Sequence, residues 1–374
     1  MKIKKNECLF FLGIMFLLLK SWISVSELFK SLQILDNILM FSAYIFFSIS
    51  IMINKPMNKE VKIDIVLITI GILTYIYSKY TAILTLFFVL ISMKNIEVKK
   101  IVKLIFLVNF FLLAIHILLY SIFMIFDIAN LKLFVRVNID KVVTRYSFFF
   151  IHPNVFAMYI FWSLAMFYYL YYEKISKLTY MLTIGIAMFV YFFPNSRTCA
   201  IEIILLLTTT IISKRKFEYK WLKYTFVIVV LFCTISIFII DNPIIMKIDD
   251  MLNTRISIGN IIYKNYGINI FGVDIRAGTP VTFINGRYIS SLTIIDSVYY
   301  SVLLNYGLVS YIIFIYLLDK TIDITKNEID NRNKVMLFVY IIYAISETSC
   351  LSPILGFPLL LLSNVFKEKL WKKK

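Results

Sequence analysis

The chain has 374 residues, of which 60% are hydrophobic and only 16% are charged. Soluble domains usually have about 45–50% apolar residues, so this composition excludes a soluble globular protein. The formal net charge of +17 often accompanies nucleic-acid binding, but the chain has no soluble domain that could carry such binding, which excludes that class.

Apolar stretches of membrane-spanning length run along the whole sequence. A transmembrane helix needs about 20 mostly apolar residues, and in hydrocarbon every backbone N–H and C=O must be bonded within the protein. The alternating pattern of an outer-membrane barrel is missing. We therefore predict an all-α fold, a polytopic integral membrane bundle of about twelve transmembrane helices that forms a single domain over residues 1–374. The predicted helices are 8–29, 34–53, 63–78, 80–93, 101–126, 147–172, 178–194, 198–213, 222–240, 296–318, 334–350 and 352–366.

Two parts of this assignment have an alternative. The third and fourth predicted helices are short and are joined by Ser78-Lys79-Tyr80, so a re-entrant hairpin is the alternative there. The basic start, Met1-Lys2-Ile3-Lys4-Lys5, precedes an apolar run and resembles a signal peptide. Because no small-residue cleavage site follows it, we expect the first helix to be retained.

Lysine and arginine are distributed unequally between the predicted loops. With both termini in the cytoplasm, the inner segments hold 26 Lys and Arg residues and the outer segments hold 12. This is the positive-inside pattern of multi-pass proteins. It predicts a cell (inner or plasma) membrane protein with both termini cytoplasmic and with its inner lysines facing anionic lipids.

Arginine shows the opposite bias. Six of the eight Arg residues fall in predicted outer segments, namely Arg136, Arg145, Arg197, Arg255, Arg276 and Arg287. The planar guanidinium group is preferred over lysine where a phosphate or carboxylate is held by two parallel hydrogen bonds. Ordinary surface ion pairs are the alternative for any single arginine. Taken together, the six predict an anionic ligand on the outer face.

One predicted outer loop, 241–295, is much longer than the others. It holds three of the outer arginines and is too aromatic and β-branched for a disordered segment. Residues 248–258 within it favour a short helix, on which Arg255 shares a face with apolar residues. An arginine in that position should have a specific anionic partner. We expect the loop to fold back over the membrane surface and to cap a cavity.

Four ionisable residues lie near the predicted outer ends of helices, where such residues are often functional. His152 precedes a proline at the start of a helix, and Arg197 lies in a turn too short to be a solvated loop. Asp296 and Glu347 lie at or near predicted helix ends. Each has a structural alternative: His152 could cap the carbonyl freed by the proline, Arg197 could anchor at the interface, and Asp296 could stabilise a helix dipole.

Other chemistries lack their residues. The sequence has no Walker loop, no GxGxxG and no HExxH, and two isolated histidines make a zinc site improbable. We therefore expect no metal and no cofactor. We interpret His116 and Glu202, near mid-bilayer, as structural polar contacts that could pair with each other. The four cysteines are interpreted as small apolar packing residues.

A set of short motifs follows in a fixed order along residues 145–310. They are Phe150-Ile151-His152-Pro153-Asn154, Asn195-Ser196-Arg197-Thr198, Arg255 in the long loop, Asn269-Ile270-Phe271-Gly272, Asp296-Ser297-Val298-Tyr299-Tyr300 and Leu304-Asn305-Tyr306-Gly307. In their order and predicted sidedness they resemble the Wzy-type oligosaccharide repeat-unit polymerases of O-antigen and capsular polysaccharide biosynthesis, which are relatives of the O-antigen ligases. Residues 1–140 carry no motif that matches.

The resemblance implies a bacterial GT-C-like membrane glycosyltransferase that is independent of metal. Such an enzyme moves a growing glycan from undecaprenyl pyrophosphate onto an incoming lipid-linked repeat unit at the outer leaflet, with a flippase and a chain-length regulator as candidate partners. We assign Arg197 and Arg255 to the substrate pyrophosphate, with Arg145 and Arg276 as helpers. One group must take the proton of the acceptor hydroxyl. His152 is the first candidate, Asp296 the second and Glu347 the third.

Two other functions remain as alternatives. An O-antigen-type ligase that transfers glycan to a different acceptor is hard to separate from a polymerase by sequence. A flippase or other transporter of lipid-linked oligosaccharides would also have about twelve helices. A transporter of this kind should have two repeated halves and charges deep in a central path, whereas this chain gathers Gly and Arg in one outer loop.

Overall fold

The computed structural model describes residues 5–53, 58–128, 133–138, 141–215, 217–277, 282–284, 287–289 and 295–366. Most of these residues are helical, as the all-α prediction required, and two short β-hairpins accompany the helices. The chain divides into two compact units. Unit 1 is formed by Met1–Ile53 and Ile96–Lys216, and unit 2 by Asn54–Asn95 and Phe217–Lys374.

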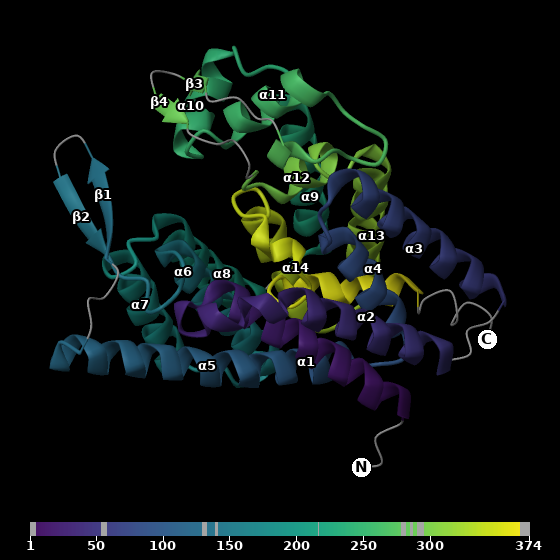
Figure 1. Ribbon diagram of the computed structural model, residues 1–374, viewed down its shortest axis with the longest axis horizontal. Coiled ribbons are helices and arrows are strands. Elements are labelled where there is room, and N and C mark those ends of the chain that lie inside the picture. The colour runs from purple at the N-terminus through teal and green to yellow at the C-terminus, as the bar shows by residue number, and fades with distance from the viewer. Residues whose placement is uncertain are drawn as a thin grey trace. The chain divides into compact units, whose positions relative to one another are not determined.

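Unit 1 is built from three pairs of packed helices and one hairpin (Figure 1). Helix α1 packs on α2, α5 on α6, and α7 on α8. The elements are α1 (Lys5–Val25), η1 (Glu27–Leu35), α2 (Asp36–Ile53), α5 (Val98–Phe126), β1 (Phe134–Asn138), β2 (Lys141–Arg145), α6 (Pro153–Leu170), η2 (Tyr172–Lys174), α7 (Lys177–Phe192) and α8 (Arg197–Ser213). Strands β1 and β2 pair in antiparallel register from Phe134↔Arg145 to Asn138↔Lys141.

A polar and aromatic cluster lies in the core of unit 1. The Trp22 indole donates to Asn109 Oδ1 over 2.8 Å. Buried His116 contacts Ser26 Oγ through Nε2 at 2.7 Å and the Leu112 carbonyl through Nδ1 at 2.8 Å. Both ring nitrogens of His116 are therefore occupied, so the proposed pairing of His116 with Glu202 is wrong, although its interpretation as a structural contact holds.

Unit 2 places α9 against α12, α13 and α14, and α3 against α4 (Figure 1). Its interior contains the fully buried rings of Tyr299, Tyr300, Tyr340 and Tyr343. The elements are α3 (Asn58–Ser78), α4 (Ala82–Ser92), α9 (Tyr219–Ser236), α10 (Pro243–Met251), α11 (Arg255–Tyr266), η3 (Ile275–Ala277), β3 (Thr282–Ile284), β4 (Arg287–Ile289), α12 (Val298–Leu304), α13 (Leu308–Thr325), α14 (Arg332–Tyr343), η4 (Ser349–Leu351) and η5 (Phe357–Ser363). The predicted loop 241–295 thus contains α10, α11 and the β3–β4 hairpin, and the side chain of Arg287 lies outside the described residues.

Several predicted helices differ from those observed. The predicted helix 296–318 is two helices, α12 and α13, and the predicted helix 334–350 ends at Tyr343. The single short helix predicted over 248–258 is broken into α10 and α11, because Asn253 and Thr254 adopt left-handed conformations with φ of 55° and 66°. Over the predicted helix 352–366, the described chain forms mainly the 3-10 helix η5.

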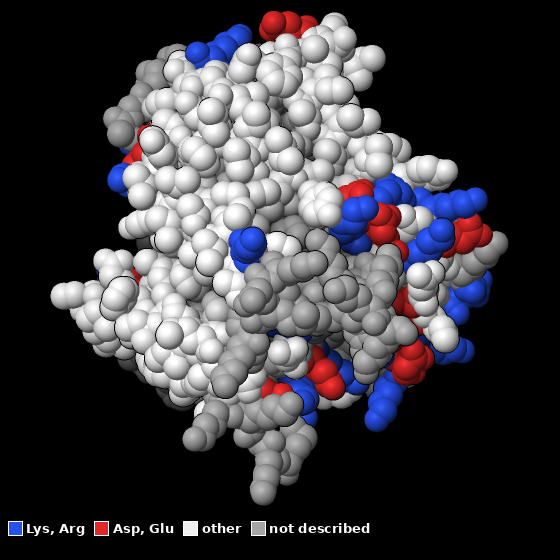
Figure 2. Space-filling model, turned by 90° about the vertical axis from the view of Figure 1, so that its right-hand side faces the viewer, with Lys and Arg blue, Asp and Glu red and all other residues white. Residues whose placement is uncertain are grey.

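Five helical segments of the described chain are long and apolar enough to cross a membrane: Asn6–Val25, Glu27–Ile53, Val61–Ser78, Val98–Phe126 and Tyr219–Ser236. Their outer surfaces carry exposed large apolar side chains such as Phe41 and Phe111, which are 66% and 65% exposed. Figure 2 shows broad areas of uncharged surface, with charged side chains gathered in patches. An apolar surface of this extent is typical of a protein that contacts lipid.

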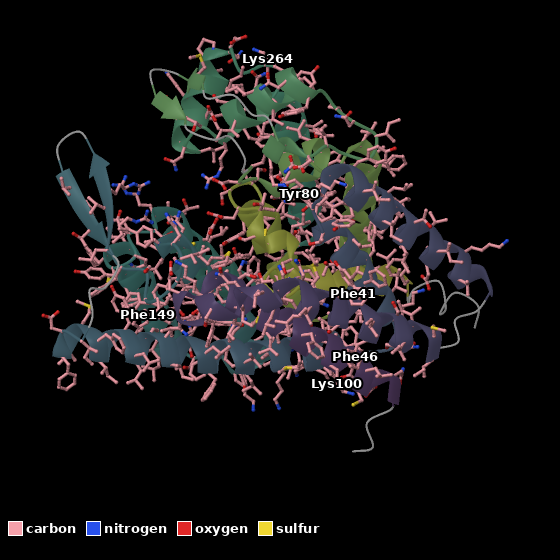
Figure 3. The ribbon with its side chains drawn as sticks, in the orientation of Figure 1. Phe41, Phe46, Tyr80, Lys100, Phe149 and Lys264 are labelled. Atoms are coloured by element: carbon pink, nitrogen blue, oxygen red, sulfur yellow. The ribbon has the colours of Figure 1, made fainter. Side chains whose placement is uncertain are left out.

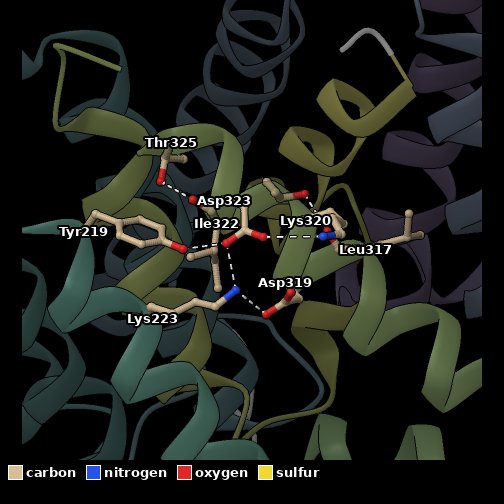
Figure 4. Close-up of polar contacts among 9 residues, drawn as sticks. Tyr219, Lys223, Leu317, Asp319, Lys320, Ile322, Asp323 and Thr325 are labelled. Carbon is tan, nitrogen blue, oxygen red and sulfur yellow. Dashed lines mark hydrogen bonds and ion pairs between the residues drawn. The ribbon is translucent and has the colours of Figure 1, made fainter. Parts of the chain in front are cut away.

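A charged network fastens α9 to α13 (Figure 4). Lys223 Nζ on α9 lies 2.6 Å from Asp319 Oδ1 and 2.8 Å from Asp323 Oδ1 on α13, and the Tyr219 hydroxyl donates to Asp323. Asp319, Lys320 and Asp323 place three charged residues within the 18 residues of α13, and for this reason the helix is not among the five candidate spans.

Candidate functional site

Arg255 begins α11, and a buried aspartate fixes that helix start. Asp249, on α10, is fully buried and accepts hydrogen bonds from the backbone N–H groups of Ile256 (2.7 Å) and Ser257 (3.3 Å), and from the Ser257 hydroxyl. The carboxylate therefore caps the otherwise unsatisfied amides of the first turn. This cap holds α10 and α11 together across their break and sets the direction of Arg255.

The guanidinium of Arg255 is buried but only partly bonded. The residue is 8% exposed, and Nη1 donates to the Leu252 carbonyl over 2.8 Å. Nη2 lies 3.6 Å from Oε1 of Glu347, and the buried Nε has no hydrogen-bond partner among the described residues. Nε and Nη2 form the edge of the guanidinium that can hold two oxygens in parallel. That edge therefore remains open to an anion or another acceptor.

Backbone and side-chain contacts bring Asp296 and Glu347 toward Arg255. The start of α12 is tied to the end of α14, because Val298 N and Ser297 Oγ both donate to the Ala344 carbonyl, over 2.9 and 3.4 Å. Asp296 immediately precedes this tie and Glu347 follows it by a few residues. The prediction that Arg255 has a specific anionic partner is confirmed, and the partner is Glu347.

The two carboxyl groups lie outside the five candidate spans, and their surroundings alter their acidity. Burial raises the pKa of Glu347, the nearby Asp296 raises it further, and Arg255 opposes both effects. Burial likewise raises the pKa of Asp296, with Arg255 again opposing. A single guanidinium cannot offset both the burial of two carboxyl groups and their mutual repulsion, so the pKa values of the pair stay above those in water. Such a pair can supply a proton acceptor at neutral pH.

Two of the sequence motifs, 269–272 and 304–307, are joined backbone to backbone in unit 2. We call this junction the clamp. Leu308 N donates to the Asn269 carbonyl over 2.9 Å, and Val273 N donates to the Asn305 carbonyl over 3.0 Å. Gly272 and Gly307 have φ of +89° and +88°, and a Cβ atom on Gly272 would lie 2.0 Å from the Asn305 carbonyl oxygen. Glycine is required where backbones approach this closely. The clamp also explains the break between α12 and α13.

In unit 1, the segment before α6 is held in place by the end of α1. Glu27 N donates to the Phe149 carbonyl and Ile151 N to the Val25 carbonyl, over 2.8 and 2.9 Å. Phe148 and Phe149 adopt positive φ angles of 50° and 63°. The predicted helix start at 147 is therefore wrong, and α6 begins at Pro153.

His152 caps the helix that follows it. Its Nδ1 accepts a hydrogen bond from the Asn154 N–H over 3.2 Å, and its ring packs edge-on against Phe134 at a centroid distance of 5.5 Å. In the neutral ring, an Nδ1 acceptor leaves the proton on Nε2. The cap thus binds an amide N–H rather than the freed carbonyl considered above, and it makes Nε2 a donor instead of a proton acceptor.

Arg145 is committed to holding its surroundings. The buried side chain donates from Nε to the Pro194 carbonyl over 2.9 Å and from Nη2 to Asn154 Oδ1. These bonds join β2, the start of α6 and the turn before α8. Arg197 begins α8 immediately after that turn, and its side chain is exposed. None of the described residues forms a hydrogen bond or ion pair with the Arg197 guanidinium.

Arg276 lies in unit 2 and already has partners. Its Nε and Nη2 atoms bond both oxygens of Asp274, at 2.9 and 3.0 Å, and its guanidinium stacks on Tyr80 at 4.8 Å from the ring centroid. The side chain is exposed. Its bidentate edge is occupied, so Arg276 is less available to an anion than Arg255.

The predicted residues therefore fall into two groups. Unit 2 brings together Arg255, Asp296 and Glu347, and unit 1 brings together Arg145, His152 and the turn that presents Arg197. The buried cap Asp249 was not singled out by the sequence, since it is six residues from Arg255 across a break that neither Gly nor Pro marks. No family model matches this chain, and neither the curated proteins nor the solved structures include one that is significantly similar to it.

Proposed function

We propose that this protein is a membrane-embedded glycosyltransferase that polymerises oligosaccharide repeat units carried on undecaprenyl pyrophosphate. The observation that carries the proposal is the open Nε–Nη2 edge of buried Arg255. A buried donor without a partner costs about 1–3 kcal/mol, and a phosphate oxygen pair matches the geometry of this edge. The nearby carboxyl groups supply the second element that glycosyl transfer needs.

The reaction requires one bond to form and one to break. The oxygen of an acceptor hydroxyl attacks the anomeric carbon of the donor glycan, and the bond from that carbon to the pyrophosphate oxygen breaks. The electron pair leaves with the pyrophosphate, whose growing charge Arg255 stabilises. The hydroxyl proton passes to a base. Because the leaving group is already a pyrophosphate, the reaction needs no nucleotide.

We assign the base to the carboxyl pair, with Glu347 first and Asp296 second. Glu347 is partly buried and its pKa is raised, which moves it toward the range in which general bases work best. His152 is a weaker candidate because its Nδ1 lone pair already accepts the Asn154 amide. Its role in the proposal is to position the start of α6.

Both lipid-linked substrates of a polymerase carry a pyrophosphate, so two anion sites are expected. Arg197 is the second candidate, since it combines a guanidinium without a described partner with the first turn of a 17-residue helix. Helix N-termini favour anions. Arg145 supports it by fixing the Pro194 carbonyl. Arg276, bound to Asp274, has an auxiliary role in this scheme.

The proposal includes the membrane arrangement predicted above: about twelve spans, a GT-C-like fold, both termini cytoplasmic, and the segment 241–295 at the outer leaflet of a bacterial cell membrane. The five apolar helices long enough to span a membrane support it. The remaining spans would be shorter helices such as α4, α7 and η5, which are apolar and shorter than a full crossing.

The test is reconstitution of the purified protein in liposomes with the lipid-linked repeat unit as the sole substrate. We expect long glycan on undecaprenyl pyrophosphate, formed without nucleotide and in the presence of a metal chelator. The matched control is Arg255→Lys. Product attached only when lipid A-core or a protein acceptor is added would favour a ligase. Movement of the lipid-linked unit across the bilayer without new glycosidic bonds would favour a flippase and contradict the proposal.

A further inference from the structure

A cavity of about 320 Å³ lies in unit 2, and two of its lining residues, Ile295 and Thr348, adjoin Asp296 and Glu347 in the chain. It is lined mainly by hydroxyl, amide and aromatic side chains, among them Tyr80, Ser301, Asn305, Tyr306, Ser349 and Ser352. The ring of Tyr80, which is labelled in Figure 3, lies 5.9 Å from that of Tyr306, just beyond the end of α12. The turn between α3 and α4, the end of α12 and the segment after α14 therefore meet around one space.

Three of the residues that line this cavity carry buried side-chain oxygens without a hydrogen-bond partner among the described residues. They are Tyr80 Oη, Asn305 Oδ1 and Ser349 Oγ. Buried polar groups are nearly always bonded, so a cluster of unsatisfied oxygens requires an explanation. The Asn305 amide nitrogen, in contrast, donates to Ser301 Oγ over 3.3 Å. The cavity thus combines polar groups with unused hydrogen-bonding capacity.

We propose that this cavity binds one neutral sugar ring of the acceptor glycan. All described residues that line it are uncharged, which disfavours a phosphate or a uronic acid. Its volume is at the lower end of the ligand-pocket range of about 300–1,000 Å³ and equals roughly ten water molecules. A pyranose ring offers hydroxyls to the Ser and Asn side chains, and its C–H faces can pack on an aromatic ring such as Tyr80.

The location gives this sugar a role in the reaction, and this part of the inference rests on the proposed function. Ile295 and Thr348 line the cavity, and they directly precede Asp296 and follow Glu347. A sugar in the cavity would therefore contact the chain directly next to both candidate bases, the region that the acceptor hydroxyl must reach. The cavity would then select the acceptor, whereas Arg255 would hold the pyrophosphate.

Sugar binding can be measured without the transfer reaction. The probes are the oligosaccharide released by mild acid from the lipid-linked repeat unit, and a panel of neutral and acidic methyl hexopyranosides. Saturation-transfer NMR on the full-length protein in detergent gives their affinities. We expect Ser349→Leu, which fills the cavity, to weaken binding of the neutral probe by at least about tenfold. Ser349→Ala, which adds no bulk, should weaken it by a smaller factor.

Thr208→Leu, at an exposed hydroxyl on α8, is the matched control and should bind like the wild type. Equal affinity in the wild type, Ser349→Leu and Ser349→Ala would mean that the cavity holds only water. Preference for acidic sugars would also overturn the proposal. Binding that depends on Ser349 in a protein that forms no glycosidic bond would leave the cavity assignment standing and remove the polymerase function. Arg255→Lys should retain binding while losing polymer.

Discussion

Nη2 of Arg255 lies 3.6 Å from Oε1 of Glu347, so the two side chains form an ion pair without a hydrogen bond. An incoming phosphate can therefore bond the guanidinium without first breaking a close contact. Arg255 lowers the pKa of Glu347, so an anion that takes over this cation should raise the proton affinity of Glu347. Binding of the donor would then increase the basicity of an ionised Glu347 carboxylate.

Replacing Arg255 with Lys should reduce polymer formation by about 10²-fold or more, because lysine keeps the charge but loses the two parallel donors. Arg197→Lys should lose most activity for the same reason. Gel analysis of glycan chain length, at matched protein levels, measures both. Arg215→Lys, at an exposed position, is the control and should be nearly silent. Equal behaviour of all three variants would remove the pyrophosphate assignment.

The carboxyl pair predicts a specific pH dependence. A base acts only when ionised, so kcat/KM should fall as the pH drops through the raised pKa of Glu347. Asp296 contributes to that elevation, so Asp296→Asn should lower the pKa of Glu347 and move the acidic limb of the profile to lower pH. Asp250→Asn, on the exposed part of α10, should leave the limb in place. A loss of the acidic limb in Asp296→Asn would instead identify Asp296 as the base.

Substitutions of His152 by Asn, Gln and Ala distinguish its role as the cap of α6 from a role as the catalytic base. Asparagine can reproduce the Nδ1 acceptor that caps Asn154, whereas glutamine places its amide nearer the position of Nε2. We expect His152→Asn to retain activity within about tenfold and His152→Ala to lose about 1 kcal/mol of stability with the cap. Chain-length analysis and thermal unfolding provide the readouts. Accumulation of single lipid-linked units in every variant, with normal stability, would restore His152 as the catalytic base.

The glycine clamp predicts a graded series of stability effects. Gly272→Ala and Gly307→Ala combine positive φ with backbone clashes at 2.0 and 2.3 Å, so each should cost more than about 3 kcal/mol and deplete the folded protein. Gly267 has positive φ without a neighbour within 4 Å and should show an intermediate loss. Gly185→Ala, helical and unobstructed, should be neutral or stabilising. A destabilised Gly185→Ala beside a stable Gly272→Ala would contradict the clamp.

Sidedness can be tested by labelling single cysteines in a background without the four native ones. Asn265→Cys, at an exposed position at the end of α11 (near Lys264, Figure 3), should react with an impermeant maleimide in intact cells. Lys373→Cys, outside the described residues, should react only after permeabilisation. The reverse pattern would invert the orientation and with it the outer-leaflet assignment.

Regular apolar runs allowed many helix bounds to be predicted. The predicted helices 101–126 and 198–213 correspond to Val98–Phe126 and Arg197–Ser213, because a continuous run of apolar residues ends where polar residues begin. The breaks at Phe148–Phe149 and Asn253–Thr254 could not be predicted in this way. Bulky residues rarely adopt positive φ, and here tertiary contacts, such as the pairing of Phe149 with Glu27, impose it.

The candidate site was predictable in its components and not in its pairings. Arg255 was expected to have an anionic partner because it shares a helix face with apolar residues. Its partner, Glu347, is distant in sequence and is brought near by the bonds from Ser297 and Val298 to Ala344. No local pattern encodes such a tie between α12 and α14. The hydrogen bonds of Arg145 to Pro194 and Asn154 are likewise visible only in three dimensions.

The clamp at Gly272 and Gly307 has a consequence for how this chain could diversify. Because Val273 and Asn305 are joined by backbone atoms, the separation of the two ends of the intervening segment does not depend on its side chains. The side chains of Val273 and Asn305 could therefore change without moving these two ends, whereas Gly272 and Gly307 must remain glycine.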